Sequence, residues 1–363
     1  MFINHLTSAQ KSDELVHYSE ERGSLFPSPL RDDLLRLRLA DIALWTLKTL
    51  AEDNYTRMQS YRQELKILQE GVFYPNDYYE ALKQRGQIKR LDWLKEKGCF
   101  YHGLAPKEFF ELVEDPQSPT GFKVGSLALK NGKKPSEALN AFQKGLTFLD
   151  CGGACQFGYY RAIESVLGKE KFDVLFAADS VTPLRLGYND PKNPIQLLMQ
   201  AVYPGFDQIR KGQIVYIRNS DYYPIKHVNG EIGGFNMFCC EDLTNIRKGQ
   251  ERFVALGLPP QGMNIEQINA ILHQEYNKDS LGMQMVTQEV ARKIFNSHSN
   301  PTQYELVLNS LKDHKLSLVE FQSSNGGYIA PLVMDLNVER IAQLANHSIQ
   351  EAGKLLAQWK KNS

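Results

Sequence analysis

The sequence predicts an α+β fold, because helical patterns come first along the chain and strand patterns follow. A long helix is expected to begin at Ser28 and Pro29, since serine is a favoured N-cap residue and proline a favoured first helical residue, and its apolar spacing continues to about Met58. Runs rich in β-branched and aromatic residues come later, at 212–219, 236–240 and 252–256, and a helical pattern at 264–276 follows them. This order is typical of helices packed on an antiparallel sheet.

Shorter patterns divide the rest of the chain. Further helices are expected at 135–142, from Cys151 onward and at 193–203, with loops and short strands at 98–132. The last part carries strand-like runs at 316–322 and 328–334 and a long helical pattern from Asn337. We therefore predict a helical N-terminal region at 1–97, a central core at 98–280 and an α+β C-terminal extension at 281–363.

Composition excludes several classes of function. Lysine plus arginine and aspartate plus glutamate both total 42, so the formal net charge is zero, and neither nucleic acid nor a membrane surface is expected as a partner. No apolar run approaches the roughly 20 residues that span a bilayer, and the first residues lack a signal-peptide pattern. The protein is therefore expected in the cytoplasm, or exported without a classical signal peptide.

Cysteine usage favours free thiols over disulfides. Five cysteines in 363 residues are an odd and sparse set, which is typical of a reducing compartment. They are Cys99, Cys151, Cys155, Cys239 and Cys240. None forms a Cys-x-x-Cys pair or a cysteine/histidine cluster at zinc spacing, so no metal and no cofactor is expected.

Cys151 is the strongest candidate for chemistry. An apolar run delivers it to the start of a helical pattern, where unpaired backbone N–H groups and the helix dipole favour a negative charge. A thiol in that position has a lowered pKa and is a better nucleophile. Gly152 and Gly153 come next and allow a substrate carbonyl to approach the backbone closely. The alternative is that Cys151 is one more buried cysteine.

A cysteine nucleophile needs a proton acceptor, and the polar loop after the first strand offers candidates. His227 and Glu231 supply an imidazole and a carboxylate among glycines, and Asn236 supplies an amide that could bind substrate. Asp150 precedes the cysteine and either takes part in catalysis or only caps the helix. A solvated side chain is the alternative for both His227 and Glu231.

Four segments resemble the small protein-glutamine γ-glutamyltransferases of bacterial spore coats. Residues 134–138 are similar to that family's Pro-Ser-x-Ala-Ile helix start, and 150–162 are similar to its Glu-Cys-Ala-Thr-Ala…Tyr-Tyr-Lys-Ala stretch at the same spacing. Residues 212–219 resemble its Gly-Asp-x-x-Tyr-Phe-Lys-Asn strand, and 229–231 lie near its Gln-Gly-Glu-Asn. The resemblance covers roughly residues 100–275 and more faintly the helix at 30–58, and it leaves the C-terminal extension outside.

The resemblance implies a papain-like core of the NlpC/P60 type, with the cysteine at a helix N-terminus packed on an antiparallel sheet. It implies that Cys151 is the nucleophile and that Glu231 is its partner, although an alternative alignment places Phe235 and Asn236 at the Glu-Asn position and removes the acid. Three features depart from the family: the acid before the cysteine is aspartate, Val228 replaces an aromatic residue, and the family's later histidine has no counterpart, so His227 would have to stand in for it.

The expected activity is therefore an acyl transfer between proteins. The thiolate of Cys151 would form a thioester with a glutamine side chain, and a lysine amine would resolve it to an isopeptide crosslink. The expected partners are thus a glutamine donor protein and a lysine acceptor protein. Two alternatives remain: a glutamine deamidase or papain-like thiol hydrolase that uses the same cysteine, and a non-catalytic interaction protein on a degenerate catalytic fold.

Overall fold

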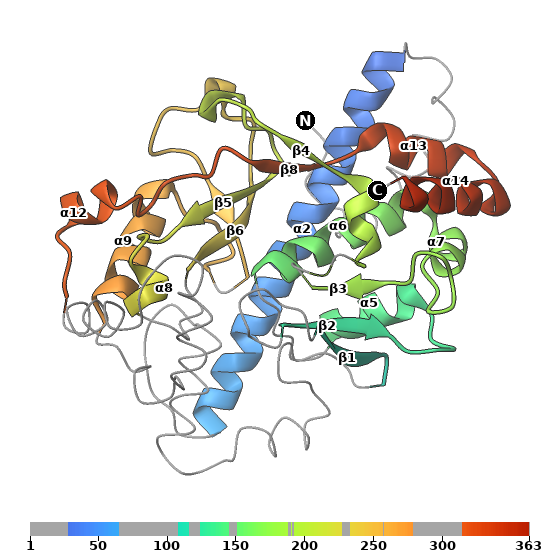
Figure 1. Ribbon diagram of the computed structural model, residues 1–363, viewed down its shortest axis with the longest axis horizontal. Coiled ribbons are helices and arrows are strands. Elements are labelled where there is room, and N and C mark those ends of the chain that lie inside the picture. Colours follow the sequence, from blue (N-terminus) through green and yellow to red (C-terminus); the bar gives the residue numbers. More distant parts are fainter. Residues whose placement is uncertain are drawn as a thin grey trace, which may run out of the picture.

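The computed structural model describes residues 28–64, 108–115, 124–144, 151–187, 190, 192–226, 233–256, 258–278 and 314–362. Helices and two antiparallel sheets make up this part of the chain, which is therefore α+β as predicted (Figure 1). The long helix α2 (Ser28–Glu64) crosses the molecule, and the last two helices, α13 (Val338–Asn346) and α14 (Ile349–Lys361), lie at the opposite side from α9 (Ile265–Asn277) and α12 (Leu318–Ser323) (Figure 1).

Two helices form the centre of the larger hydrophobic core. α2 (Ser28–Glu64) packs along α6 (Cys151–Leu167) through buried residues that include Leu39, Ala43 and Leu47. α6 is covered around most of its circumference, because 13 of its 17 residues are buried. Its position is therefore fixed from several sides.

A small antiparallel sheet lies at one end of this core. Its order is β1-β2-β3, with β1 at Phe110–Asp115, β2 at Val124–Leu129 and β3 at Arg185–Leu186. The helices beside it are α5 (Pro135–Lys144) and α7 (Lys169–Leu175). The backbone N–H and the hydroxyl of Ser136 both donate to the Asp173 carboxylate, at 2.7 and 2.9 Å, which joins the first turn of α5 to α7.

The larger sheet has the order β4-β8-β5-β6-β7, and its strands pair antiparallel throughout. Its strands are β4 (Met199–Val202), β5 (Ile214–Arg218), β6 (Gly234–Cys239), β7 (Phe253–Val254) and β8 (Val333–Leu336). β8 therefore lies between two strands that precede it by more than 100 residues. The division of the chain at 1–97, 98–280 and 281–363 stays a prediction. β8 comes from the third of these regions and is hydrogen-bonded to β4 and β5 of the second.

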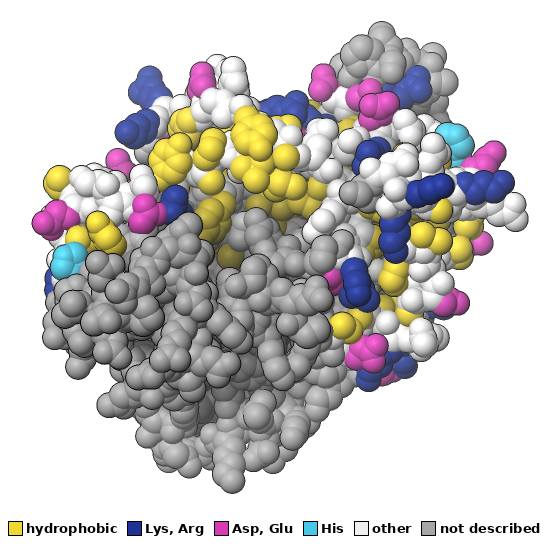
Figure 2. Space-filling model, in the orientation of Figure 1, with side chains coloured by type: hydrophobic (Ala, Val, Ile, Leu, Met, Phe, Trp, Pro, Cys, Tyr) yellow, Lys and Arg dark blue, Asp and Glu magenta, His cyan; other side chains and the backbone are white. Residues whose placement is uncertain are grey.

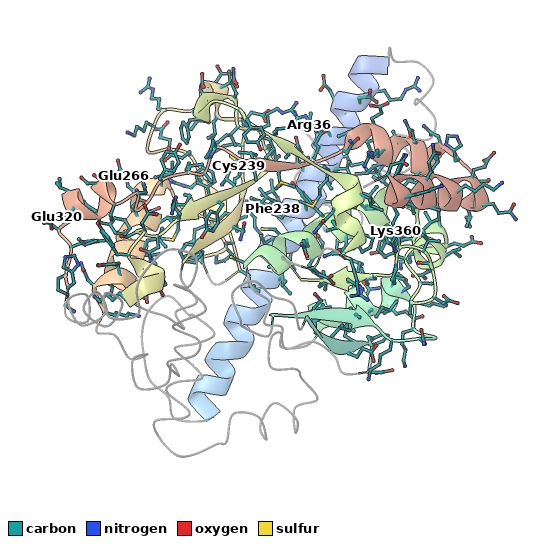
Figure 3. All side chains as sticks on the ribbon, in the orientation of Figure 1. Arg36, Phe238, Cys239, Glu266, Glu320 and Lys360 are labelled. Atoms are coloured by element: carbon teal, nitrogen blue, oxygen red, sulfur yellow. The ribbon has the colours of Figure 1, made fainter. Side chains whose placement is uncertain are left out.

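Helices pack on both faces of this sheet. The first face, defined by Ile214, Phe238 and Met334, packs toward α6 and α2. The second face, defined by Val215, Met237 and Val333, belongs to a separate core. That second core is completed by buried residues of α9 (Ile265–Asn277) and α12 (Leu318–Ser323), with α8 (Tyr223–Lys226) beside them. Phe238 and Cys239, which are labelled in Figure 3, are neighbours on β6, and each packs into a different one of the two cores.

A glycine allows α6 to approach the first face closely. A Cβ atom on Gly158 would lie 2.8 Å from a ring carbon of Phe238 and 3.1 Å from the carbonyl oxygen of Ala43. The ring of Tyr159 packs against that of Phe238 with 5.1 Å between centroids. Its hydroxyl donates to the backbone carbonyls of Gly212, at 2.9 Å, and Met334, at 3.2 Å, so α6 is joined to both β8 and the turn before β5.

The helix expected at 193–203 is wrong. Pro194–Leu198 is a short 3₁₀ helix, η1, which Asn193 caps by accepting a hydrogen bond from Ile195 N–H at 3.1 Å. The following residues, Met199–Val202, form β4. Pairing with β8 satisfies their backbone groups, and this long-range ladder outweighs the local helical pattern.

Two expectations in the C-terminal extension are also wrong. The strand-like run at 316–322 is α12, because Ser317 and Glu320 form a capping box that satisfies its first N–H groups. The single helix expected from Asn337 is two, α13 (Val338–Asn346) and α14 (Ile349–Lys361), since a second capping box starts at Ser348. In the strand-like run at 328–334, Ile329 forms an isolated bridge with Ile217, and Val333 and Met334 begin β8.

The remaining short elements are η2 (Phe206–Gln208) and η3 (Leu243–Asn245). None of the helices in the described ranges combines the length and the apolarity that crossing a bilayer requires.

Candidate active site

Cys151 is the first residue of α6, and its side chain is half-buried. The backbone N–H of Asn236 donates to its sulfur at 3.3 Å, and the side-chain amide of Asn236 donates to the same sulfur at 3.5 Å. Hydrogen bonds to the sulfur and the positive end of a helix dipole both favour negative charge there. The first turn of α6 and the middle of β6 therefore surround the thiol with groups that suit a thiolate.

Asn236 forms hydrogen bonds with two thiols whose surroundings differ, those of Cys151 and Cys155. Its carbonyl oxygen accepts a hydrogen bond from Cys155 Sγ at 3.6 Å, and Cys155 is fully buried. Cys155 lies one helical turn after Cys151 and donates, whereas the sulfur of Cys151 accepts. The four described cysteines (Cys151, Cys155, Cys239 and Cys240) are thiols and not disulfides.

The two cysteines of β6 and its end are poor nucleophiles. Burial raises the pKa of Cys239 to about 12, and burial also raises the pKa of Cys240. Cys239 donates to the carbonyl oxygen of Glu241 at 3.1 Å. Cys151 therefore differs from Cys155 and Cys239 in being half-exposed and in accepting hydrogen bonds.

A buried polar network fixes the second turn of α6. The side-chain oxygen of Gln156 accepts hydrogen bonds from the backbone of Gly187 at 3.1 Å and from the amide of Asn193 at 2.8 Å. The hydroxyl of Tyr160 donates to Asn193 Oδ1 at 2.8 Å. Burial raises the pKa of Tyr160 above its usual range, so this hydroxyl stays protonated. The network holds the turn of α6 that follows Cys151 against the segment 187–193.

The structure brings some of the predicted site residues together. Asn236 contacts Cys151, and Gly152 and Gly153 are buried in the first turn of α6. Asp150, His227 and Glu231 lie outside the described residues, so the choice between Glu231 and His227 as proton acceptor stays a prediction. The role of Asn236 in binding substrate also stays a prediction.

The described residues on either side of 227–232, the segment that includes His227 and Glu231, are anchored. Before it, the buried Lys226 ammonium donates to the backbone carbonyls of Tyr276, at 2.8 Å, and His314, at 2.7 Å. After it, the carbonyl of Gly233 accepts from the Asn219 N–H and the Tyr216 hydroxyl, both at 2.9 Å.

Sequence reasoning missed two parts of this arrangement. The backbone N–H of Asn236 carries no residue-type signal, because every residue except proline has one. The Gln156 network joins α6 to the segment 187–193, which lies 31 to 37 residues from Gln156, so only the fold brings its members together. The Asn236 side chain was a candidate from its place in a glycine-rich loop and strand after the cysteine helix, but its contact with the Cys151 sulfur was not predicted.

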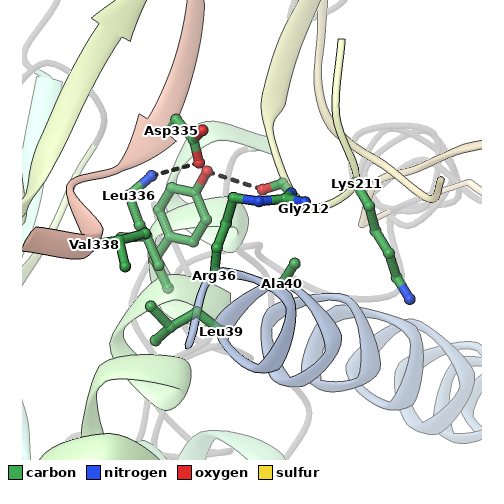
Figure 4. Close-up of a pocket in the computed structure, with 9 residues that line it drawn as sticks. Arg36, Leu39, Ala40, Lys211, Gly212, Asp335, Leu336 and Val338 are labelled. Atoms are coloured by element: carbon green, nitrogen blue, oxygen red, sulfur yellow. Dashed lines mark hydrogen bonds between the residues drawn. The ribbon is translucent and has the colours of Figure 1, made fainter. Parts of the chain in front are cut away.

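The pocket in Figure 4 is a separate feature. It lies between α2, the turn before β5 and the end of β8. Tyr159 is the residue of α6 that lines it, and Tyr159 is about two helical turns from Cys151. It is lined by Arg36, Leu39, Ala40, Tyr159, Lys211, Gly212, Asp335, Leu336 and Val338. Neither Cys151 nor Asn236 lines it.

Among the described residues, no three His, Cys, Asp or Glu side chains gather in a way that could hold a metal ion. His227 and Glu231 are not among those residues.

Comparison with known proteins finds a likeness in structure. No protein-family model matches the sequence, and no curated protein sequence matches it. The structure is similar to the transglutaminase from Geobacillus stearothermophilus (without C-terminal extension), with 14% sequence identity and a TM-score of 0.46. The match covers 87% of this chain and 98% of the other.

Proposed function

We propose that this protein is a cysteine-dependent protein-glutamine γ-glutamyltransferase with Cys151 as its nucleophile. The observation that carries the proposal is the pair of hydrogen bonds from Asn236 to the Cys151 sulfur, at 3.3 and 3.5 Å, at the first residue of α6. A cysteine helix packed on an antiparallel sheet is the papain-like arrangement expected for such chemistry.

The surroundings of Cys151 also weigh against a non-catalytic protein. A degenerate site would favour a thiol that is either fully exposed or enclosed by apolar groups. Cys151 is instead half-buried, and two N–H groups point at its sulfur. Such a thiol is accessible to a substrate and is prepared for negative charge.

The proposed reaction has two transfers. The Cys151 sulfur gives its proton to a base and bonds to the amide carbon of a glutamine side chain. The carbon–nitrogen bond breaks, and ammonia leaves with the proton. A lysine amine then bonds to the thioester carbon, the carbon–sulfur bond breaks, and the amine proton goes to the base.

Asn236 cannot be that base, because both of its groups at the sulfur are donors. We place Glu231 first and His227 second in this role. Asp150 follows as a group that orients the cysteine or caps α6.

Mass spectrometry tests the proposal. A glutamine peptide without lysine is incubated with a primary amine and the protein, without added calcium, and Cys151→Ala serves as the inactive control. An amine adduct of the glutamine, made by the native protein and not by the variant, is the expected result.

Two other outcomes decide against transfer. A gain of about 1 Da without adduct, at millimolar amine, identifies a deamidase, because water alone then resolves the thioester. Adduct formation that survives Cys151→Ala removes the nucleophile assignment. A matched variant, Cys155→Ala, is expected to keep the activity because its buried thiol lies one turn away from the reacting one.

A further inference from the structure

An exposed apolar surface continues along the first face of the larger sheet beyond Cys151. We call it the aromatic shelf and define it as Tyr203, Tyr216, Tyr328 and Leu332. Tyr203 is 74% exposed, Tyr328 is 53% exposed and Leu332 is 40% exposed. Figure 2 shows hydrophobic side chains gathered where β4 and the segment that enters β8 lie. Large exposed apolar side chains in a group mark interaction sites more often than chance exposure does.

The alternation of side chains places the shelf on the same face as the nucleophile. Val202 and Val333 pack into the second core, so their neighbours Tyr203 and Leu332 point to the first face. Ile329 bridges Ile217 and packs into the second core, so Tyr328 also points to the first face.

Adjacent strands connect the shelf to the thiol. Asn236, which contacts Cys151, is paired with Tyr216 across the β5–β6 ladder. On the other side of β5, the N–H of Ala330 donates to the carbonyl of Tyr216 at 2.8 Å. A line across the sheet therefore runs from Cys151 over Tyr216 to the segment that carries Tyr328 and Leu332.

Tyr216 is held in place at the centre of this line. Its hydroxyl donates to Gly233, and its ring lies over Gly234, where a Cβ atom would be 2.5 Å from the tyrosine oxygen. Gly234 has φ +157°, at the limit of the region that favours glycine. The ring is thus a fixed floor between the nucleophile and the exposed part of the shelf.

We propose that the aromatic shelf binds the glutamine donor polypeptide through an apolar or aromatic side chain near its reactive glutamine. This inference rests on the proposed function, because it takes Cys151 as the position of that glutamine. It also gives the C-terminal extension a role in substrate binding, since Tyr328 and Leu332 come from residues 281–363, the part of the chain outside the family resemblance.

The spacing of the strands sets where that side chain should be. Neighbouring strands lie about 4.8 Å apart, so Tyr328 and Leu332 are about 10 Å from β6, and Tyr203 is about 14 Å from it. An extended peptide advances about 3.3 Å per residue. The apolar side chain is therefore expected about three or four residues from the glutamine.

The chemistry of the shelf favours a polypeptide with an uncharged flank. The shelf consists of three tyrosines and a leucine, and tyrosine is a residue type enriched at protein interfaces. The described charge beside it on the first face, Arg218, is paired with Asp221. The four side chains of the shelf carry no charge, so an apolar or aromatic flank suits them better than an acidic or basic one.

Binding to the Cys151→Ala variant tests the shelf separately from catalysis. Fluorescent glutamine peptides carry one leucine, moved stepwise through the positions on either side of the glutamine, with serine as the reference. Leucine at about three or four residues from the glutamine is expected to lower the dissociation constant about tenfold. Leu332→Ser and Tyr203→Ser should remove this preference.

Leu318→Ser is the matched control, since Leu318 is 49% exposed and lies on α12. It should keep the leucine preference. Equal binding of leucine and serine peptides overturns the proposal, and so does the same loss of preference in Leu318→Ser. If light scattering shows that Leu332→Ser only dissociates a dimer, the shelf is a contact between copies and the proposal fails. A leucine preference without turnover by the native protein supports the shelf and sinks the proposed function.

Discussion

The two faces of the larger sheet differ in how completely they are covered. On the second face, Val215, Ile217 and Met237 are fully buried beneath α9 and α12. On the first face, α6 covers Phe238 and Ile214, but the same strands continue into Asn236, Tyr216 and the exposed shelf. The covered face gives stability, and the partly covered face carries Asn236 beside Cys151 and the exposed shelf.

This difference also explains why chemistry is expected at one cysteine only. Cys151 begins the helix that covers the first face, so its sulfur is at the border between core and surface. Cys155 and Cys239 lie inside the first and second cores. Perturbing one face at a time should therefore separate reactivity from stability.

Alkylation by iodoacetamide should separate the two faces by orders of magnitude. With its pKa raised to about 12, Cys239 is expected to be thiolate in only about one molecule in 10⁵ at pH 7. Cys151 should react first, even at mildly acidic pH, as peptide mapping by mass spectrometry would record. Faster labelling of Cys155, Cys239 or Cys240 would contradict the assignment of the nucleophile.

Truncating one aromatic residue on each face should separate stability from reactivity. Phe321→Ala on α12 and Phe238→Ala on β6 are each expected to cost about 3–5 kcal/mol in the free energy of unfolding, because both side chains are fully buried. Phe238→Ala should also slow alkylation of Cys151, since Phe238 packs against Tyr159 of α6.

Urea titration measures the loss in the free energy of unfolding. The alkylation rate of Cys151, taken well below the urea midpoint, measures the change in reactivity. Phe321→Ala is the control for the second, because it opens the other face. Equal slowing by both variants would show that the faces are not independent.

Changing Asn236 should shift the reactivity of Cys151 without unfolding the sheet. Asn236→Asp replaces a donor at 3.5 Å by a carboxylate, whose negative charge disfavours the thiolate. We expect the pH profile of alkylation to move to higher pH and the rate at neutral pH to fall about tenfold. Asn236→Ala keeps the backbone donor, so its alkylation rate at neutral pH should lie between those of the native protein and Asn236→Asp. A profile unchanged in both variants would remove Asn236 from the site.

The helix caps should give the smallest effect, and it depends on pH. Hydrogen bonds from Ser317 lower the pKa of Glu320, and those from Ser348 lower the pKa of Glu351. A carboxyl with a lowered pKa in the folded state contributes stability above its unfolded pKa and loses it as the pH falls through the folded value. Ser317→Ala and Ser348→Ala should therefore lower Tm by a few degrees at neutral pH and by less in acid.

Ser317 caps α12, which contributes to the second core, whereas Ser348 caps α14, which lies outside the larger sheet. The two variants therefore test caps in two different parts of the molecule. Thermal unfolding followed by circular dichroism at neutral and acidic pH measures both variants. A larger loss of Tm in acid than at neutral pH would contradict the assigned direction of the pKa shifts.

Local signals in the sequence were enough to define several elements. Pro135 and Ser136 predict the start of α5, Asn264 predicts that of α9, and the runs at 212–219 and 236–240 predict β5 and β6. The start of α6 at Cys151 could be predicted for the same reason: helix caps and side-chain periodicity extend over only a few residues.

How these elements meet depends on the tertiary structure. Met199–Val202 is a strand because β8, more than 100 residues later, supplies its hydrogen-bonding partner. The donors at Cys151 come from the register of β6, and the aromatic shelf depends on the insertion of β8 beside β5. Pairing between distant segments depends on both partners at once, so no local pattern in either segment specifies it.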